Sequence, residues 1–194
     1  MRKAEIERKT NETDIRLSFS LDGEGRADVR CGIGFFEHML SAFCRFGLFD
    51  MELTCAGDLD VDAHHTVEDV GICLGQAIAQ SLGDKRGITR LGHACVPMDE
   101  ALAFVALDVS GRPFLVFDAQ FSAPMVGAMD TQLAQEFFRA VAVGAGLTLH
   151  MRVPYGQNDH HKIEALFKAF GRALMDASSL DPRVRGVPST KGVL

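Results

Sequence analysis

A short motif of paired histidines and a glutamate occurs twice in this chain, and this duplication constrains the fold more than any other feature. The two copies are Asp62-Ala63-His64-His65-Thr66-Val67-Glu68 and Asn158-Asp159-His160-His161-Lys162-Ile163-Glu164. The offset between them is 96 positions (160 minus 64), and they hold four of the seven histidines. We therefore expect two similar halves, each carrying one copy.

The spacing within each copy is typical of a metal-binding helix. In a helix, His64 and Glu68 lie one turn apart on one face, as do His160 and Glu164. Imidazole and carboxylate together form a donor set for first-row transition metals. The second histidine of each pair points about 100° away from the first. One helix thus offers ligands in two directions, which suits two metals. A lone histidine is more often structural, but two copies at matching positions favour metal binding.

Hydrophobic periodicity predicts the elements of the first half. Apolar residues alternate over 15–21, which indicates a half-buried strand, and a turn at 22–25 precedes an expected returning hairpin strand at 26–31. Helical spacing over 33–46 ends at Gly47, a suitable C-cap. A strand over 49–55 follows, and the first motif helix extends to about residue 83.

The second half repeats this order. We expect a strand at 101–109, a turn at 110–113, a returning strand at 114–119, a helix at 131–145, a strand at 147–153 and the second motif helix. The boundary falls near 84–87, so a single domain (1–194) would comprise repeats 1–87 and 88–194, with a C-terminal tail at 181–194. Each half would be an antiparallel sheet with two helices on one face, an α+β arrangement. Since each sheet meets only two helices, we expect the halves to bury one another.

Composition limits the class of protein. With 194 residues, 47% hydrophobic and 24% charged, the chain is typical of a soluble globular protein. A net charge of −6 argues against nucleic-acid binding. The longest apolar run, 140–149, is too short to span a bilayer, and the start of the chain lacks the apolar core of a signal peptide. Five cysteines without C-x-x-C spacing indicate reduced thiols in a cytoplasmic protein.

Two metal sites need donors beyond the motifs, and His38 and His150 are natural third histidines. Three histidines and one glutamate per metal would use six histidines and both glutamates, leaving His93 structural. One site would comprise His64, Glu68, His150 and His161, and the other His38, His65, His160 and Glu164. Such sets favour Mn, Fe, Co or Zn, and their open coordination positions indicate catalysis rather than a closed structural zinc.

Basic residues outside the motifs are candidates for holding an anion. They are Arg90, Arg112 and Lys168, which follows Glu164 by one turn. The segment Pro188-Ser189-Thr190-Lys191-Gly192 combines hydroxyls, N–H groups and an ammonium, a set suited to phosphate. From spacing alone each is equally a surface charge, and the tail is equally a frayed terminus.

Four segments together carry a family resemblance. GIGFFEHML (32–40), DAHHTVEDVGICLG (62–75), NDHHKIEALFKAF (158–170) and PSTKG (188–192) resemble imidazoleglycerol-phosphate dehydratases of histidine biosynthesis. The resemblance covers nearly the whole chain. It implies a duplicated fold with an antiparallel or mixed four-stranded sheet and two helices per half, like the second domain of ribosomal protein S5. It also implies a homo-oligomer of twenty-four subunits, with two Mn²⁺ per active site between neighbouring subunits.

The resemblance also assigns residues. Its metal ligands fall on the eight residues named above by counting: His38, His64, His65, Glu68, His150, His160, His161 and Glu164. Its substrate contacts fall on Glu12, Arg90, Arg112, Lys168, Ser189 and Lys191, beside the ligands His38, His64, His65, Glu68, His160 and His161. Three residues depart from the family pattern: Cys31 stands where the family often has a hydroxyl residue, Ala42 where some members have glutamine, and Phe46 where histidine is common. With Ala42, this chain would lack the polar contact to the substrate that a glutamine could make.

A reaction follows as a hypothesis. D-erythro-imidazole glycerol phosphate would lose water to give imidazole acetol phosphate, through a metal-held imidazolate and a diazafulvene-like intermediate. Glu12 would move the proton, the motif residues His64, Glu68, His160 and Glu164 would take part in catalysis, and the basic residues would anchor the phosphate.

Two other functions stay open from the residues alone. One is a different di-metal enzyme, such as a hydrolase, which the imidazole substrate would separate from a dehydratase. The other is a metal-storage or shell protein without turnover. Replacing Glu12 would abolish turnover only if the protein is the expected enzyme. The expected ligand is a small phosphorylated imidazole, with neither nucleic acid nor membrane as a partner.

Overall fold

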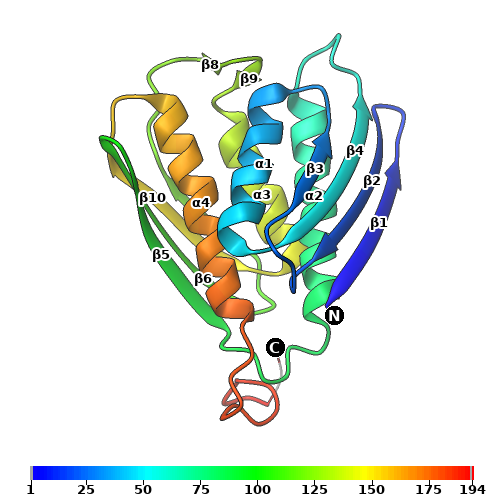
Figure 1. The fold of residues 1–194 in the computed structure, drawn as a ribbon, viewed down its shortest axis with the longest axis vertical. Coiled ribbons are helices and arrows are strands. Elements are labelled where there is room, and N and C mark those ends of the chain that lie inside the picture. Colours follow the sequence, from blue (N-terminus) through cyan, green and yellow to red (C-terminus); the bar gives the residue numbers. More distant parts are fainter. Residues whose placement is uncertain (1, 193) are drawn as a thin grey trace.

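The fold consists of two four-stranded sheets that enclose four helices (Figure 1). A computed structural model describes residues 2–192 and 194. The first half contains β1 (Lys3–Lys9), β2 (Thr13–Ser20), β3 (Ala27–Arg30), α1 (Gly34–Gly47), β4 (Asp50–Gly57) and α2 (His64–Leu82). The second contains β5 (Leu91–Met98), β6 (Ala101–Asp108), β7 (Phe114–Asp118), the short pair β8 (Met125–Val126) and β9 (Met129–Asp130), α3 (Leu133–Ala145), β10 (Thr148–Tyr155) and α4 (Asp159–Ser178).

The two halves share one topology, which confirms the predicted duplicated α+β fold. The strand orders are β1-β2-β4-β3 and β5-β6-β10-β7. In each sheet one edge strand runs parallel to its neighbour: β3 beside β4 in the first sheet, and β7 beside β10 in the second. The sheets are therefore mixed rather than purely antiparallel.

The predicted hairpins at 22–25 and 110–113 are wrong. Strand β2 already pairs with β1 on one side and β4 on the other, so β3 joins the free edge of β4 instead. In the second half, β6 likewise pairs with β5 and β10, so β7 joins the free edge of β10. The true hairpins are β1–β2 and β5–β6, whose first strands the periodicity did not predict. In β1 only Ala4 and Ile6 are buried, and the other residues are charged. Strand β5 contains Gly92 and Pro97, which weaken the pattern expected of a strand.

The halves interlock, as expected. Helix α2 packs against α3 of the other half, and α4 packs against α1. Buried phenylalanines of the two halves pack against one another: the rings of Phe43 and Phe170 stack with centroids 5.2 Å apart, and those of Phe36 and Phe137 meet edge to face at 5.2 Å. Neither half therefore has a complete core by itself.

Two glycines at matching positions permit these helix crossings. A Cβ at Gly171 would lie 2.5 Å from the carbonyl oxygen of Phe43, and a Cβ at Gly75 would lie 2.8 Å from that of Val141. Distances below 3 Å force neighbouring atoms to move. Within residues 2–192 and 194, no helix is long and apolar enough to cross a membrane.

Candidate metal centre and substrate site

Both motif copies begin their helices at the same end of the molecule (upper end in Figure 1). The residue two positions before the first histidine accepts a hydrogen bond from the start of each helix: Asn158 is the N-cap of α4, and Asp62 precedes Ala63, the N-cap of α2. The Asp62 carboxylate accepts the N–H of His64 at 2.7 Å, and the Asn158 amide oxygen accepts that of His160 at 2.9 Å. These side chains satisfy N–H groups that a helix start leaves free. The two histidine pairs are thereby held in the first turn of α2 and α4.

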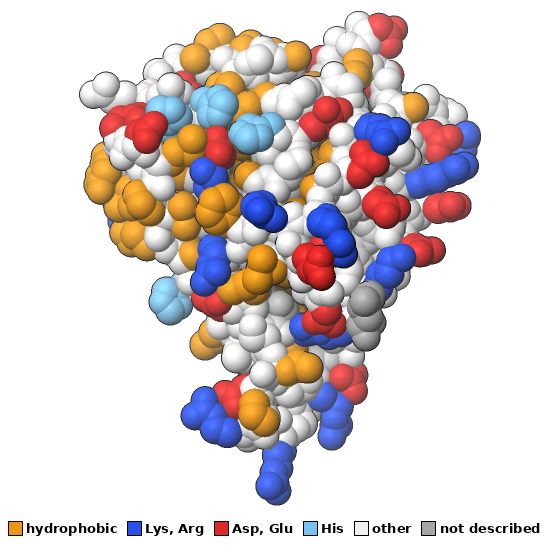
Figure 2. Space-filling model, viewed as in Figure 1, with side chains coloured by type: hydrophobic (Ala, Val, Ile, Leu, Met, Phe, Trp, Pro, Cys, Tyr) orange, Lys and Arg blue, Asp and Glu red, His pale blue; other side chains and the backbone are white. Residues whose placement is uncertain are grey.

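The second copy forms a compact cluster with α1. His160 Nε2 lies 3.0 Å from Glu164 Oε2, and His38 Nε2 lies 3.4 Å from the same oxygen. One ligand atom from each residue lies within 4.8 Å of the others. Figure 2 shows histidine side chains gathered over this end of the molecule, beside acidic and basic groups. Two imidazole nitrogens and a carboxylate oxygen at this separation suit a divalent transition metal.

Glu164 is anionic although its side chain is only 7% exposed. Burial favours the neutral acid, but the hydrogen bond and charge of Lys168, followed by His160 and His38, lower the pKa of Glu164 below its ordinary value. Lys168 Nζ lies 2.8 Å from Glu164 Oε1 and 5.1 Å above the ring of Phe46. Phe46, one of the predicted departures from the family pattern, thus carries a cation–π contact.

The first copy is more open. His64 Nε2 and Glu68 Oε2 lie 3.7 Å apart, and both side chains are about two-fifths exposed. His65 points toward the β1–β2 turn, with Nε2 3.7 Å from Glu12 Oε1 and Nδ1 2.9 Å from Asp58 Oδ2. The Asp58 carboxylate raises the pKa of His65 above its ordinary value, against the lowering effect of burial.

His161 has a matching environment. Its Nδ1 lies 2.7 Å from Glu100 Oε2, and its Nε2 lies 3.6 Å from Asp99 Oδ2. Glu100 raises the pKa of His161. The N–H of Asn158, then His161 and the N–H of Gln157, lower the pKa of Glu100 to about 2. Asp58, Asp99 and Glu100 were not predicted from the sequence. Asp99 and Glu100 form the turn between β5 and β6, so finding them from the sequence would have required a prediction of strand β5.

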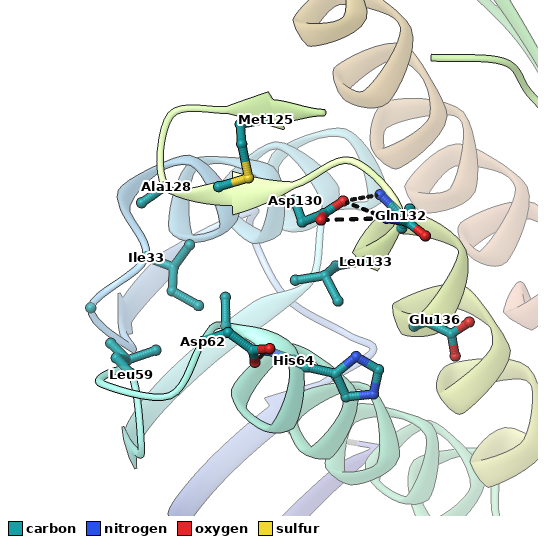
Figure 3. A pocket seen from close by; sticks show the side chains of 12 residues that line it. Ile33, Leu59, Asp62, His64, Met125, Ala128, Asp130, Gln132, Leu133 and Glu136 are labelled. Atoms are coloured by element: carbon teal, nitrogen blue, oxygen red, sulfur yellow. Dashed lines mark hydrogen bonds between the residues drawn. The ribbon is translucent and has the colours of Figure 1, made fainter. Parts of the chain in front are cut away.

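A cavity of about 450 Å³ adjoins His64 (Figure 3). It lies between the start of α2, the β8–β9 hairpin and the start of α3. Its lining is partly apolar, with Ile33, Leu59, Met125 and Leu133. The polar part includes Asp62, His64, Asp130, Gln132 and Glu136. Its size suits a small ligand.

Lys168 lies beside Glu164, but the other predicted phosphate-binding residues lie at the opposite end of α4. The N–H of Arg90 donates to the carbonyl of Ala177, in the last turn of this 20-residue helix, which is about 30 Å long. The Arg90 guanidinium forms two hydrogen bonds to Asp108, at 2.6 and 2.9 Å, and one to the Pro188 carbonyl at 2.8 Å. Ser189 and Lys191 follow in the tail, and the Arg112 carbonyl accepts from Thr148 at the start of β10.

His150 is also separated from the other predicted ligands. It lies on the outer face of the second sheet, where it lines a cavity of about 450 Å³ with His93, Phe104 and Val116. Across the described residues, one group of three histidine, cysteine or carboxylate side chains brings a ligand atom from each within 4.8 Å of the others: His38, His160 and Glu164. The two complete four-ligand sets therefore stay a prediction.

Of the departures, Cys31 and Ala42 are buried. Burial raises the pKa of the Cys31 thiol to about 12, so it stays protonated and fills space. Ala42 likewise packs in α1 without a polar group.

Comparisons with known proteins agree on one family. Residues 31–174 match the family model described as imidazoleglycerol-phosphate dehydratase. The chain is 60% identical over 193 residues to the protein of that name from Acetivibrio thermocellus, covering 100% of this chain and 99% of the relative. It is 56% identical over 194 residues to that of Bacillus subtilis, covering 100% of both.

Solved structures give the same result. The imidazoleglycerol-phosphate dehydratase of Staphylococcus aureus superposes with a TM-score of 0.84 at 40% identity, over 92% of this chain and 99% of that one. The Pyrococcus furiosus enzyme, solved in complex with (S)-C348, gives 0.84 at 35% identity, over 97% and 100%. Sequence, fold and the doubled histidine motif together establish that the chain belongs to the imidazoleglycerol-phosphate dehydratase family of hydro-lyases.

Proposed function

We propose that this protein dehydrates D-erythro-imidazole glycerol phosphate to imidazole acetol phosphate and water in L-histidine biosynthesis, using two Mn²⁺ per active site. The observation that carries the proposal is the convergence of His38, His160 and Glu164 at the start of α4. Five free cysteines suit a reducing cytoplasm as the place of action.

The donor atoms fit divalent metal ions. His38, His160 and Glu164 would hold one ion, with His65 as the proposed fourth ligand. His64 and Glu68 would hold the other, with His150 and His161. Bound ions would supply Lewis-acid stabilisation of developing negative charge and a template for the imidazole ring.

The protein's own side chains have separate tasks. Glu12 is proposed to move the proton, because its half-exposed carboxylate lies on the β1–β2 turn beside His65. Lys168 keeps Glu164 ionised as a ligand. Arg90, Arg112, Lys168, Ser189 and Lys191 are proposed to hold the phosphate and so to fix the reacting carbon.

These tasks require more than one copy of the chain. Arg90 contacts the last turn of α4, whereas His160 lies in its first turn, so one chain does not bring both to one substrate. His150 faces outward on the second sheet. We propose that neighbouring subunits complete each active site within a homo-oligomer of twenty-four copies.

The test is dehydratase turnover on imidazole glycerol phosphate with chelator-stripped protein, before and after Mn²⁺ is added. Activity that appears only with Mn²⁺ is expected. Folded, metal-loaded protein that forms no product would refute the dehydratase function and favour a hydrolase or a storage shell.

The Glu12→Gln variant separates catalysis from assembly. It should bind Mn²⁺ and assemble like the parent protein but lose turnover, because the proposed ligands are intact. Full activity in this variant would exclude Glu12 as the proton-moving group.

A further inference from the structure

Two carboxylates outside the predicted site make the same contact in the two halves. Asp58 Oδ2 lies 2.9 Å from Nδ1 of His65, and Glu100 Oε2 lies 2.7 Å from Nδ1 of His161. These histidines are the second of each motif pair. The carboxylates are not related by the repeat, because Asp58 lies 7 residues before its histidine and Glu100 lies 61 before its own. The two halves thus reach one arrangement from different elements, the β4–α2 connection and the β5–β6 turn.

This contact decides which ring nitrogen carries the proton. An ionised carboxylate only accepts hydrogen bonds, so Nδ1 of each ring must be the donor. In the neutral ring, Nε2 then has a free lone pair. Nε2 of His65 faces Glu12 Oε1 at 3.7 Å, and Nε2 of His161 faces Asp99 Oδ2 at 3.6 Å. Such a pair of acceptors is satisfied either by a proton on Nε2 or by a metal ion bound beside it.

We propose that Asp58 and Glu100 are positioning residues that hold His65 and His161 in the Nδ1–H tautomer and so present Nε2 of each ring to a metal ion. A carboxylate behind a ligating histidine commonly fixes its tautomer and orientation in this way. The tautomer part rests on the hydrogen bonds alone, and the metal part rests on the proposed function.

The two carboxylates differ in how firmly they are held. Glu100 Oε1 accepts the N–H groups of Gln157 and Asn158, at 2.9 and 2.7 Å, while Oε2 meets His161. Both oxygens are therefore committed to donors. Asp58 Oδ1 is buried without a hydrogen-bond partner among the described residues, so only its other oxygen is committed. Amide variants at the two positions should behave differently.

Glu100→Gln is the sharper test because it is isosteric. The two backbone N–H groups require an acceptor at the Oε1 position, which places the amide oxygen there and the NH₂ group against His161 Nδ1. Nδ1 must then accept, and the proton moves to Nε2. Magic-angle-spinning NMR of the metal-free protein labelled with ¹⁵N-histidine reports the tautomer, at a pH above the histidine pKa values. We expect one ring to change from Nδ1–H to Nε2–H.

Metal affinity supplies the second measurement. Titration with Mn²⁺ alone should show affinity about 10- to 100-fold lower in Glu100→Gln, the usual cost of losing such a partner. Glu24→Gln is the matched control, because Glu24 is an exposed carboxylate that pairs with Arg26 away from the motifs. The control should keep the parent spectrum and affinity.

Asp58→Asn provides the contrast. Its amide can turn its oxygen toward Nδ1, so we expect His65 to keep its tautomer and Mn²⁺ affinity to fall less than in Glu100→Gln. Asp58→Ala removes the acceptor and should release the tautomer.

An unchanged His161 tautomer in Glu100→Gln would overturn the proposal, and so would a changed tautomer with unchanged Mn²⁺ affinity. Absence of dehydratase turnover in the parent protein, with both effects present, would overturn the proposed function while the positioning role stood.

Discussion

The two sheets have the same topology, but the outer face of the first is charged and polar, whereas that of the second is more apolar. On the first sheet, rows of paired residues across the strands are charged or polar: Glu5, Ser18, Glu52 and Asp28, then Glu7, Arg16, Thr54 and Arg30. At the matching rows of the second sheet stand His93, Ala106, His150 and Val116, then Cys95, Phe104, Arg152 and Asp118. Phe104 and Phe114 remain 44% and 62% exposed there.

This difference shows that packing fixes the residue type on the inner face of each sheet but leaves the outer face free to differ. Inward positions of both sheets must stay apolar because each covers two helices. Outward positions have no such requirement, so the first sheet suits water and the second suits contact with protein. His150 lies on the apolar face, where the first sheet has Glu52.

The largest expected effect is on assembly. Phe104→Glu places a charge on the apolar face, and burying it in a subunit contact would cost several kcal/mol. We expect smaller species by light scattering, with loss of activity because the proposed sites lie between subunits. Arg16→Glu, at the matching position of the polar sheet, should keep the parent mass. Equal masses for the two variants would show that the second sheet is not a subunit contact.

The two motif glutamates should differ in stability but not in activity. Glu164→Gln and Glu68→Gln each remove a proposed metal ligand, and we expect turnover to fall about 10²- to 10³-fold in both. Only Glu164→Gln should also destabilise the metal-free protein, by roughly 1–3 kcal/mol, because it leaves Lys168 without its buried partner.

Turnover assays and thermal unfolding after chelation measure the two effects. Glu68, which is 38% exposed, serves as the matched control for unfolding. A metal-free Glu164→Gln protein as stable as the parent would contradict the importance of the Lys168 pair.

The helix crossings should respond alike, because their glycines match. Gly171→Ala and Gly75→Ala each push a Cβ against a backbone carbonyl, and we expect about 1–3 kcal/mol of destabilisation from each. Gly34→Ala is the control, since no atom lies within 4 Å of its added Cβ. Denaturant unfolding compares the three. A neutral effect at Gly171 would show that α1 and α4 can separate without loss.

The smallest expected effect concerns Asp159, whose counterpart in the first copy is Ala63. Burial alone would raise the pKa of Asp159, but Lys162, at 2.6 Å, and the N–H groups of Ala123 and Ser122 lower it. A lowered pKa in the folded state adds stability above the unfolded value of 3.8, and this stability is lost as pH falls through the folded pKa.

Asp159→Asn should therefore lose about 1–2 kcal/mol at neutral pH, and its difference from the parent should shrink below pH 3.8. Denaturant unfolding at both pH values measures this. The exposed Asp14→Asn, which loses only the pair with Lys9, should match the parent. A difference for Asp159→Asn that persists in acid would assign the loss to packing rather than charge.

Local patterns determined much of this protein. The helical period of the doubled motif placed His64 beside Glu68 and His160 beside Glu164. The end of the first helix was predicted to within one residue: Gly47, the expected C-cap, is the last helical residue, and Leu48 is the left-handed C-cap. These features depend on residues within one or two turns, so the sequence alone contains them. The duplication predicted two similar halves because two copies of one motif can be compared directly along the chain.

Only the tertiary structure decided how distant segments meet. Strand pairing depends on which sheet edges are free, so β3 joins β4 although β2 precedes it in the chain. The β5–β6 hairpin brings Glu100 to His161, and the packing of α1 against α4 brings His38, but not His150, to Glu164. Spacing along the chain carries no record of such contacts, because they arise when separate elements pack together.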